Sequence, residues 1–283
     1  MRAVAARIWS AARDRQRQRR LAGLFFLFGV GCSGVAAIVA GAAPWVISGV
    51  TALGLALYLW EWASRPFDAG PWAGAALGAA AFPLLEALCV WLGKRYGRST
   101  WCYAPGVLRG WEEALGVPAW LFFLWACAGA FVVALHDGLA DVASAAFGRD
   151  ASLCRRSARA SAMLFACFGA AAAAAVWLIV WAPPLGTAAG LAAMATTALA
   201  AVGSWPSWPS LVAPLATCAA VSAVFPLLES LCCMTSKAWA YHPDAGLLPG
   251  INVPVWLFPL WTIIALAFVQ AGAAGRALQA THA

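Results

Sequence analysis

The chain has 283 residues, of which 64% are hydrophobic and only 10% are charged, and its formal net charge at pH 7 is +7. A soluble domain normally carries about 25% charged residues, so this composition excludes a water-soluble globular protein. The mean hydropathy of +0.80 indicates a multi-pass membrane protein. Seven of the 18 Lys and Arg lie in residues 1–20. Such a basic arm before an apolar helix favours an orientation signal and contact with anionic membrane lipid over nucleic-acid binding.

Eight apolar stretches follow, each close to the roughly 20 residues that a membrane-spanning helix needs. They lie at 21–43, 44–62, 71–93, 116–136, 160–182, 184–203, 209–233 and 253–275. Pro44 and the pair Pro183-Pro184 separate the closest neighbours, and because Pro interrupts a helix, we expect tight hairpins there. The spacing of Gly70, Gly74 and Gly78 predicts close packing between helices. The predicted fold class is all-α, a bundle of about eight transmembrane helices.

The two halves of the chain resemble each other. Four blocks recur in the same order, at offsets of 136 to 143 residues. They are 24–29 and 164–169, 82–89 and 225–232, 101–103 and 239–241, and 117–125 and 253–261. A repeat of this kind predicts a tandem duplication. The predicted organisation is a basic arm (1–20), a four-helix repeat (21–136), a linker (137–159), a second four-helix repeat (160–275) and a tail (276–283).

Four helices in each repeat make the two repeats parallel in the membrane. With the N-terminus in the cytosol, the cytosolic segments hold 13 Lys and Arg and the opposite side holds five. The positive-inside rule therefore favours both termini in the cytosol. We expect the first helix to be retained because it has an internal counterpart, although residues 1–20 also fit an Arg-rich organellar targeting segment.

Glu86 and Glu229 occupy equivalent positions in the predicted repeats, each three residues after a proline, Pro83 or Pro226. A carboxylate at the centre of a membrane helix costs about 2.5–3.5 kcal/mol on insertion scales and is a functional candidate by default. Parallel repeats could bring the two side chains together near the pseudo-two-fold axis. Three interpretations stay open: anchoring of the fold at the membrane interface, a site for a ligand or proton, and direct catalysis.

Aromatic and proline motifs flank each of these glutamates. They are Trp101 and Tyr103, Trp239 and Tyr241, Pro118 and Trp120, and Pro254 and Trp256. Trp and Tyr often form belts at the membrane interface, which is the structural interpretation. The functional alternative is an aromatic lining for a flat or polyene-like ligand. The sequence lacks the motifs of P-loop, G-x-S-x-G, G-x-G-x-x-G and H-E-x-x-H proteins, and we expect neither a metal site nor a cofactor.

The order of a Glu, a Trp-x-Tyr pair and a Gly-x-Pro-x-Trp-Leu segment, followed by Leu-Trp, resembles that of small uncharacterised microbial multi-pass membrane proteins. The first repeat carries GVPAWL at 116–121, whereas the second has Asn252 in place of the Gly. More loosely, the order is similar to that of membrane carotenoid hydratases and cyclases. The resemblance covers about 50 residues of each repeat. Each Pro is followed by Leu-Leu-Glu with a single acid, which departs from the cyclase pattern, so no catalytic role is carried over.

Three functions are consistent with these observations. The first is transport or binding of a small molecule or lipid at a paired-glutamate site between the repeats. The second is an enzyme that acts on an isoprenoid or carotenoid-like lipid, with one Glu as general acid toward a double bond. The third is a structural or assembly subunit. The expected partners are membrane lipid and a lipophilic small molecule, and the oligomeric state and the host membrane stay open.

Overall fold

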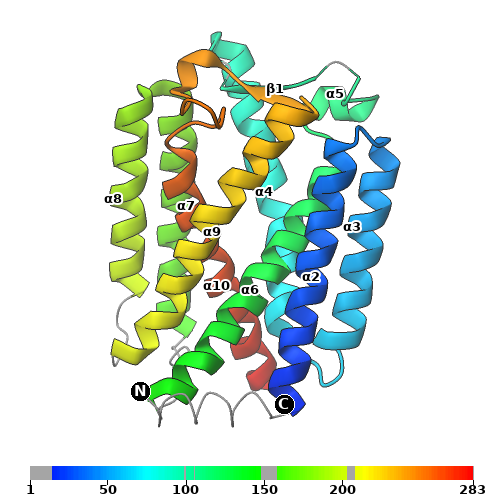
Figure 1. Ribbon diagram of the computed structural model, residues 1–283. Coiled ribbons are helices and arrows are strands. Elements are labelled where there is room, and N and C mark those ends of the chain that lie inside the picture. Colours follow the sequence, from blue (N-terminus) through cyan, green and yellow to red (C-terminus); the bar gives the residue numbers. More distant parts are fainter. Residues whose placement is uncertain (1–14, 99, 105, 148–157, 203–207, 283) are drawn as a thin grey trace.

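The computed structural model describes residues 15–98, 100–104, 106–147, 158–202 and 208–282. Over these ranges the protein is an all-α bundle of long helices (Figure 1). In chain order the elements are α2 (Arg15–Val39), α3 (Pro44–Tyr58), η1 (Leu59–Ala63), α4 (Ala69–Tyr96), β1 (Trp101–Tyr103), α5 (Trp111–Leu115), α6 (Trp120–Phe147), α7 (Ala158–Trp181), α8 (Pro184–Val202), α9 (Trp208–Thr235), β2 (Trp239–Tyr241), η2 (Pro243–Ala245) and α10 (Leu257–His282). Most of the predicted basic arm (1–20) and residues 148–157 of the predicted linker lie outside the described residues.

Six helical segments are long and apolar enough to cross a membrane within the described residues. They are α2, α3 with η1, α4, α6, α9 and α10. The chain is therefore an integral, multi-pass membrane protein. The sequence predicted eight spans, but the described apolar parts of α7 and α8 are shorter, at Cys167–Trp181 and Pro184–Leu199.

The helices alternate in direction along the bundle axis (Figure 1). α2 begins and α10 ends at one end of the bundle, which we call the terminal end. β1, α5 and β2 lie at the opposite end, which we call the ribbon end. α2, α4, α7 and α9 run toward the ribbon end, and α3, α6, α8 and α10 return from it. Both Trp-x-Tyr motifs therefore lie at the same end of the bundle.

Local sequence explains where the central helices begin and end. Asp68 caps the N-terminus of α4, since its side chain accepts a hydrogen bond of 2.9 Å from the Gly70 N–H. Gly97 ends α4 in the left-handed conformation, with φ of 66°. α6 was predicted to end at residue 136, but it continues to Phe147. Residues 137–147, assigned to the linker from the sequence, are therefore helical.

Glycines allow α4 and α6 to pack backbone against backbone. A Cβ atom on Gly78 would lie 2.1 Å from the carbonyl oxygen of Trp125, and one on Gly129 would lie 2.1 Å from the carbonyl oxygen of Gly74. Only residues without a side chain permit such an approach. The prediction of close packing along this face of α4 is confirmed. The contact fixes α4, which carries Glu86, against α6.

β1 and β2 form a short antiparallel ribbon across the ribbon end of the bundle. Trp101 pairs with Tyr241, Tyr103 pairs with Trp239, and Cys102 faces Ala240 at the middle of the ribbon. Successive side chains of a strand point to opposite faces. The exposed Cys102 and Ala240 lie on the outer face, so the four aromatic side chains point into the bundle.

Candidate functional site

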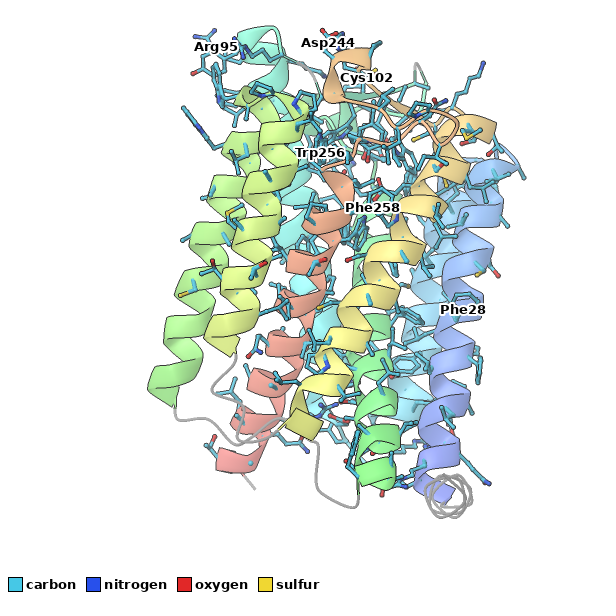
Figure 2. The ribbon with its side chains drawn as sticks, turned by 60° about the vertical axis from the view of Figure 1, so that its left-hand side comes forward. Phe28, Arg95, Cys102, Asp244, Trp256 and Phe258 are labelled. Atoms are coloured by element: carbon cyan, nitrogen blue, oxygen red, sulfur yellow. The ribbon has the colours of Figure 1, made fainter. Side chains whose placement is uncertain are left out.

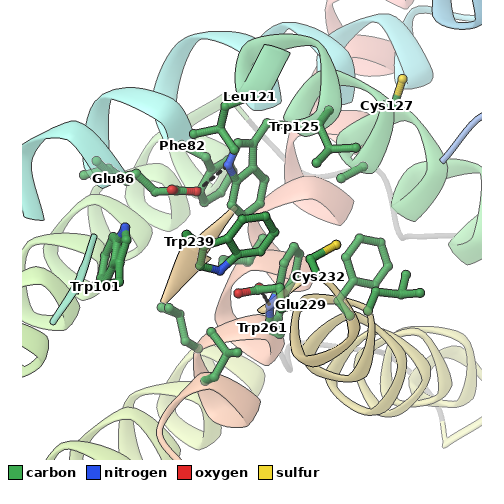
Figure 3. A pocket seen from close by; sticks show the side chains of 18 of the residues that line it. Phe82, Glu86, Trp101, Leu121, Trp125, Cys127, Glu229, Cys232, Trp239 and Trp261 are labelled. Atoms are coloured by element: carbon green, nitrogen blue, oxygen red, sulfur yellow. Dashed lines mark hydrogen bonds between the residues drawn. The ribbon is translucent and has the colours of Figure 1, made fainter. Parts of the chain in front are cut away.

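A cavity of about 230 Å³ lies in the bundle below the ribbon, and we call it the central cavity. Residues of α2, α4, α6, α7, α9, α10 and both strands line it. Glu86 from α4 and Glu229 from α9 both face it, and Figure 3 shows them with several of the aromatic residues that surround them. Most of the other lining residues are aliphatic or aromatic. The structure therefore brings the two predicted glutamates to one shared apolar cavity.

Glu86 is held by one tyrosine and one tryptophan. Its Oε2 atom accepts a hydrogen bond of 3.0 Å from the Tyr103 hydroxyl, and its Oε1 atom accepts one of 2.6 Å from the Trp125 indole N–H. The tyrosine belongs to β1 and the tryptophan to α6. The carboxyl group thereby ties α4 to the ribbon and to the adjacent helix.

Glu229 has the equivalent pair of partners. The Tyr241 hydroxyl donates to its Oε2 atom, and the Trp261 indole N–H donates to its Oε1 atom over 2.7 Å. An ionised carboxylate offers about four acceptor sites. Two donors therefore leave each carboxyl group with unused acceptor capacity where it faces the cavity.

A column of four aromatic rings connects the two carboxyl groups. Trp125 and Trp261 stack at its centre, with ring centroids 5.0 Å apart. Phe82 stacks on Trp125 at 4.8 Å, and Phe225 packs on Trp261 at 4.4 Å. Rings at these distances attract one another beyond the area they bury. Trp125 and Trp261, which donate hydrogen bonds to the glutamates, are thus each held in position by neighbouring rings.

The ribbon covers the cavity at its end. Tyr103 and Tyr241 lie outside the membrane-spanning helices, and burial, followed by the neighbouring carboxyl groups, raises the pKa of each phenol well above its usual value. Both phenols therefore keep their protons and remain donors to the glutamates. Trp101 contacts Trp256, and Trp239 contacts Trp120, at centroid distances of 6.4 and 6.2 Å, which closes the aromatic wall.

The titratable groups that line the cavity are all acids. Besides the two glutamates they are the phenols of Tyr103 and Tyr241 and the thiols of Cys32, Cys89, Cys127 and Cys232. Among the described residues of the lining, none is Lys, Arg or His. Any negative charge on the carboxyl groups therefore meets only neutral donors in the cavity wall.

The central cavity reaches the surface of the bundle between α2 and α9. It is lined there by Phe28 and Val224, which are 46% and 41% exposed. Figure 2 shows Phe28 on α2, well below the ribbon and within the apolar part of the bundle. Both residues belong to helices that are long and apolar enough to cross a membrane.

The structure places the predicted site residues in two groups. Those that line the cavity are Glu86, Glu229, Trp101, Tyr103, Trp239, Tyr241, Trp120 and Trp256. Pro83 and Pro226 lie inside α4 and α9, and Pro118 and Pro254 precede α6 and α10, so these four shape helices without lining the cavity.

Trp125 and Trp261 also line the cavity, although the sequence did not mark them as candidate site residues. Both belong to a repeated block, and each lies in the second turn of its helix, on the face that meets a glutamate. The repeat was the signal that could have identified them. Their pairing with the glutamates depends on contacts between helices, which spacing along the chain does not reveal.

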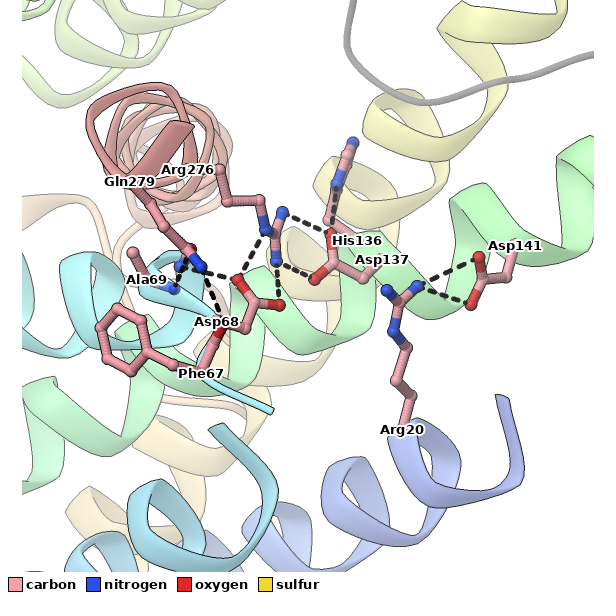
Figure 4. Close-up of polar contacts among 10 residues, drawn as sticks. Arg20, Phe67, Asp68, Ala69, His136, Asp137, Asp141, Arg276 and Gln279 are labelled. Atoms are coloured by element: carbon pink, nitrogen blue, oxygen red, sulfur yellow. Dashed lines mark hydrogen bonds and ion pairs between the residues drawn. The ribbon is translucent and has the colours of Figure 1, made fainter. Parts of the chain in front are cut away.

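A second polar cluster lies at the terminal end (Figure 4). The Arg276 guanidinium donates to Asp68 at 2.8 Å and also to Asp137. Gln279 accepts a hydrogen bond from the Ala69 N–H. This cluster, which we call the Arg276 cluster, ties the end of α10 to α4 and α6. Asp137, which lies beyond the predicted end of α6 at residue 136, thus has its cationic partner within the bundle.

No protein-family model, no curated protein and no solved structure matches the chain, so the site is interpreted from its own geometry.

Proposed function

We propose that the protein binds a small lipophilic molecule in the central cavity, as a membrane carrier or receptor, with Glu86 and Glu229 as its polar recognition groups. The observation that carries this proposal is the shared apolar cavity into which both carboxyl groups face. Ligand sites are typically concave and mostly apolar, with a small number of convergent polar groups. The central cavity is lined mostly by apolar residues, and the two carboxyl groups are its convergent polar groups.

Energetics favour a ligand site over a purely structural pair. Each carboxyl group in a membrane helix carries an insertion cost of about 2.5–3.5 kcal/mol. If a carboxyl group served folding alone, we would expect neighbouring donors to occupy all of its hydrogen-bond acceptor sites. Here two donors hold each carboxyl group, and the remainder of its surface meets an open volume.

The proposal includes an arrangement of two parallel four-helix repeats, eight helices in all, with the cavity between them. The matching partners of Glu86 and Glu229 support it, as does the pairing of one Trp-x-Tyr motif with the other. We also propose that the terminal end faces the cytosol. Arg19, Arg20 and Arg276 lie there, and an excess of basic residues favours the cytosolic side.

The test is saturable binding of a neutral hydrophobic fluorophore, N-phenyl-1-naphthylamine, by the protein in phosphatidylcholine nanodiscs. Leu85 and Leu228 line the cavity, whereas their chain neighbours Leu84 and Leu227 are 54% and 52% exposed. A Leu85→Trp/Leu228→Trp variant fills the cavity, and a Leu84→Trp/Leu227→Trp variant adds the same rings to the outer surface. Binding above that of empty nanodiscs should be lost only in the first variant. Equal binding by both would refute a site in the cavity.

A further inference from the structure

We propose that the ligand of the central cavity is a lipophilic cation, an amine or quaternary ammonium group on an apolar body, whose charged group lies between Glu86 and Glu229. This inference rests on the proposed function and names the class of molecule that the cavity takes.

Charge balance is the first argument. The cavity wall contains two carboxyl groups and six weaker acids, and no basic side chain among its described residues. A carboxylate in an apolar environment requires a partner of opposite charge or a proton. Since the described wall provides no cation, the two carboxyl groups are balanced either by protons or by a bound cation that takes the place of those protons.

The aromatic wall is the second argument. The faces of Trp and Tyr rings carry negative potential and attract cations that lie within about 6 Å of the ring centroid. Outside the stacked column, the cavity is lined by four further tryptophans and by the two tyrosines that hold the glutamates, namely Trp101, Trp120, Trp239, Trp256, Tyr103 and Tyr241. Aromatic cages with adjacent carboxylates recognise ammonium groups, including quaternary ones that cannot donate a hydrogen bond.

Hydrogen-bond polarity is the third argument. The two hydroxyl hydrogens and the two indole hydrogens nearest the glutamates are already donated to them. What the carboxyl groups still offer to a ligand is acceptor capacity. A cationic or hydrogen-bond-donating group fits this environment, whereas an anion would be repelled by it.

The size of the cavity and the position of its opening indicate the size and shape of the apolar part of the ligand. A volume of about 230 Å³ is smaller than the roughly 300–1,000 Å³ of sites for drug-sized ligands. The cavity therefore takes a compact charged group with an attached ring or short chain. A longer apolar tail would leave through the opening at Phe28 and Val224 and lie in the membrane.

A pair of isosteres separates charge from shape. Benzyltrimethylammonium is a permanent cation, and neopentylbenzene has the same shape with carbon in place of nitrogen. Both are titrated against bound N-phenyl-1-naphthylamine on the full chain in phosphatidylcholine nanodiscs. The cation should displace the fluorophore with at least tenfold higher affinity than the hydrocarbon. In a Glu86→Gln/Glu229→Gln variant this preference should disappear, while the affinity for the hydrocarbon stays within twofold.

Glu61→Gln is the matched control, because Glu61 lies at the terminal end and pairs with Arg19 away from the cavity. This variant should keep the full preference for the cation. Equal affinities of the two isosteres for the unmodified protein would overturn the inference, as would a preference that survives in the double Gln variant. In either case fluorophore binding that Leu85→Trp/Leu228→Trp abolishes would leave the proposed function intact. Absence of fluorophore binding would instead refute the proposed function itself.

Discussion

Trp125 and Trp261 stack with 22° between their ring planes, and each donates its indole N–H to a different glutamate. The stack joins α6 to α10, and the hydrogen bonds extend it to α4 and α9. The positions of the two carboxyl groups are therefore coupled through one pair of rings. A displacement of either glutamate must disturb the stack or break a hydrogen bond.

Replacing either stacked tryptophan by phenylalanine tests this coupling. Trp125→Phe and Trp261→Phe keep a ring but remove the donor to a partly buried carboxyl group, so we expect each to lower the free energy of unfolding by about 1–3 kcal/mol. Thermal unfolding in detergent measures the loss. Trp91→Phe is the control, because Trp91 is also on a spanning helix but is 57% exposed. An equal loss in all three variants would show that the hydrogen bonds do not matter.

Glycine substitutions in two helices should have opposite effects. Gly78→Ala would force a methyl group against the Trp125 carbonyl, and overpacking of this kind costs about 1–3 kcal/mol. Gly49→Ala meets nothing within 4 Å on α3 and should stabilise the helix by about 0.5–1 kcal/mol. The melting temperatures of the two variants, compared with that of the unmodified protein, should therefore shift in opposite directions. A gain in Gly78→Ala would contradict the close contact between α4 and α6.

The protein should lose stability at alkaline pH through the two ribbon tyrosines. The pKa of each phenol is raised in the folded protein, whereas in the unfolded chain it lies near 10.0. Above about pH 10 the unfolded chain therefore releases protons that the folded protein keeps, and unfolding becomes easier as the pH rises. Thermal unfolding at pH 8 and pH 11 should show a smaller drop for Tyr103→Phe/Tyr241→Phe than for the unmodified protein. Equal drops in melting temperature for the two proteins would mean that other groups cause the loss of stability at alkaline pH.

Arg276→Lys should weaken the terminal end even though it keeps the charge. A guanidinium binds two carboxylates through a rigid set of donors, whereas an ammonium group cannot reproduce that geometry. We expect a loss on the order of 1–3 kcal/mol, because hydrogen bonds to Asp68 and Asp137 are removed. Arg95→Lys, at an exposed arginine near the opposite end of α4, should change the melting temperature little. Similar shifts in the two variants would argue against a special role for the cluster.

The repeated blocks were the most informative feature of the sequence. They identified both glutamates and the four aromatic residues of the ribbon, and the structure places all six at one cavity. The sequence also marked Asn252 as a departure from the glycine at position 116. Both residues have positive φ, 80° at Gly116 and 50° at Asn252, and Asn is among the few other residues that adopt this conformation readily. Each residue therefore allows the turn that precedes its helix, which is α6 for Gly116 and α10 for Asn252.

Contacts between distant segments were beyond prediction from the sequence. Asp137 and Arg276 are 139 residues apart in the chain, so their ion pair could not be read from the sequence around either residue. His136 is the last residue of the predicted fourth span (116–136), and it is only 4% exposed because α6 continues beyond it. The opening between α2 and α9 likewise depends on how the helices cross, which hydropathy does not encode.

The two strands of the ribbon make equivalent contacts with each other. Trp101 faces Tyr241 just as Tyr103 faces Trp239, so exchanging the two strands reproduces the same contact. Two-fold homodimers are built from contacts with this property. If the chain consists of two repeats, as proposed, a polypeptide with one repeat would hold one glutamate and one Trp-x-Tyr strand that could pair with the strand of a second copy. The joined chain gains freedom that such a dimer lacks, because either half of the cavity can change without the other.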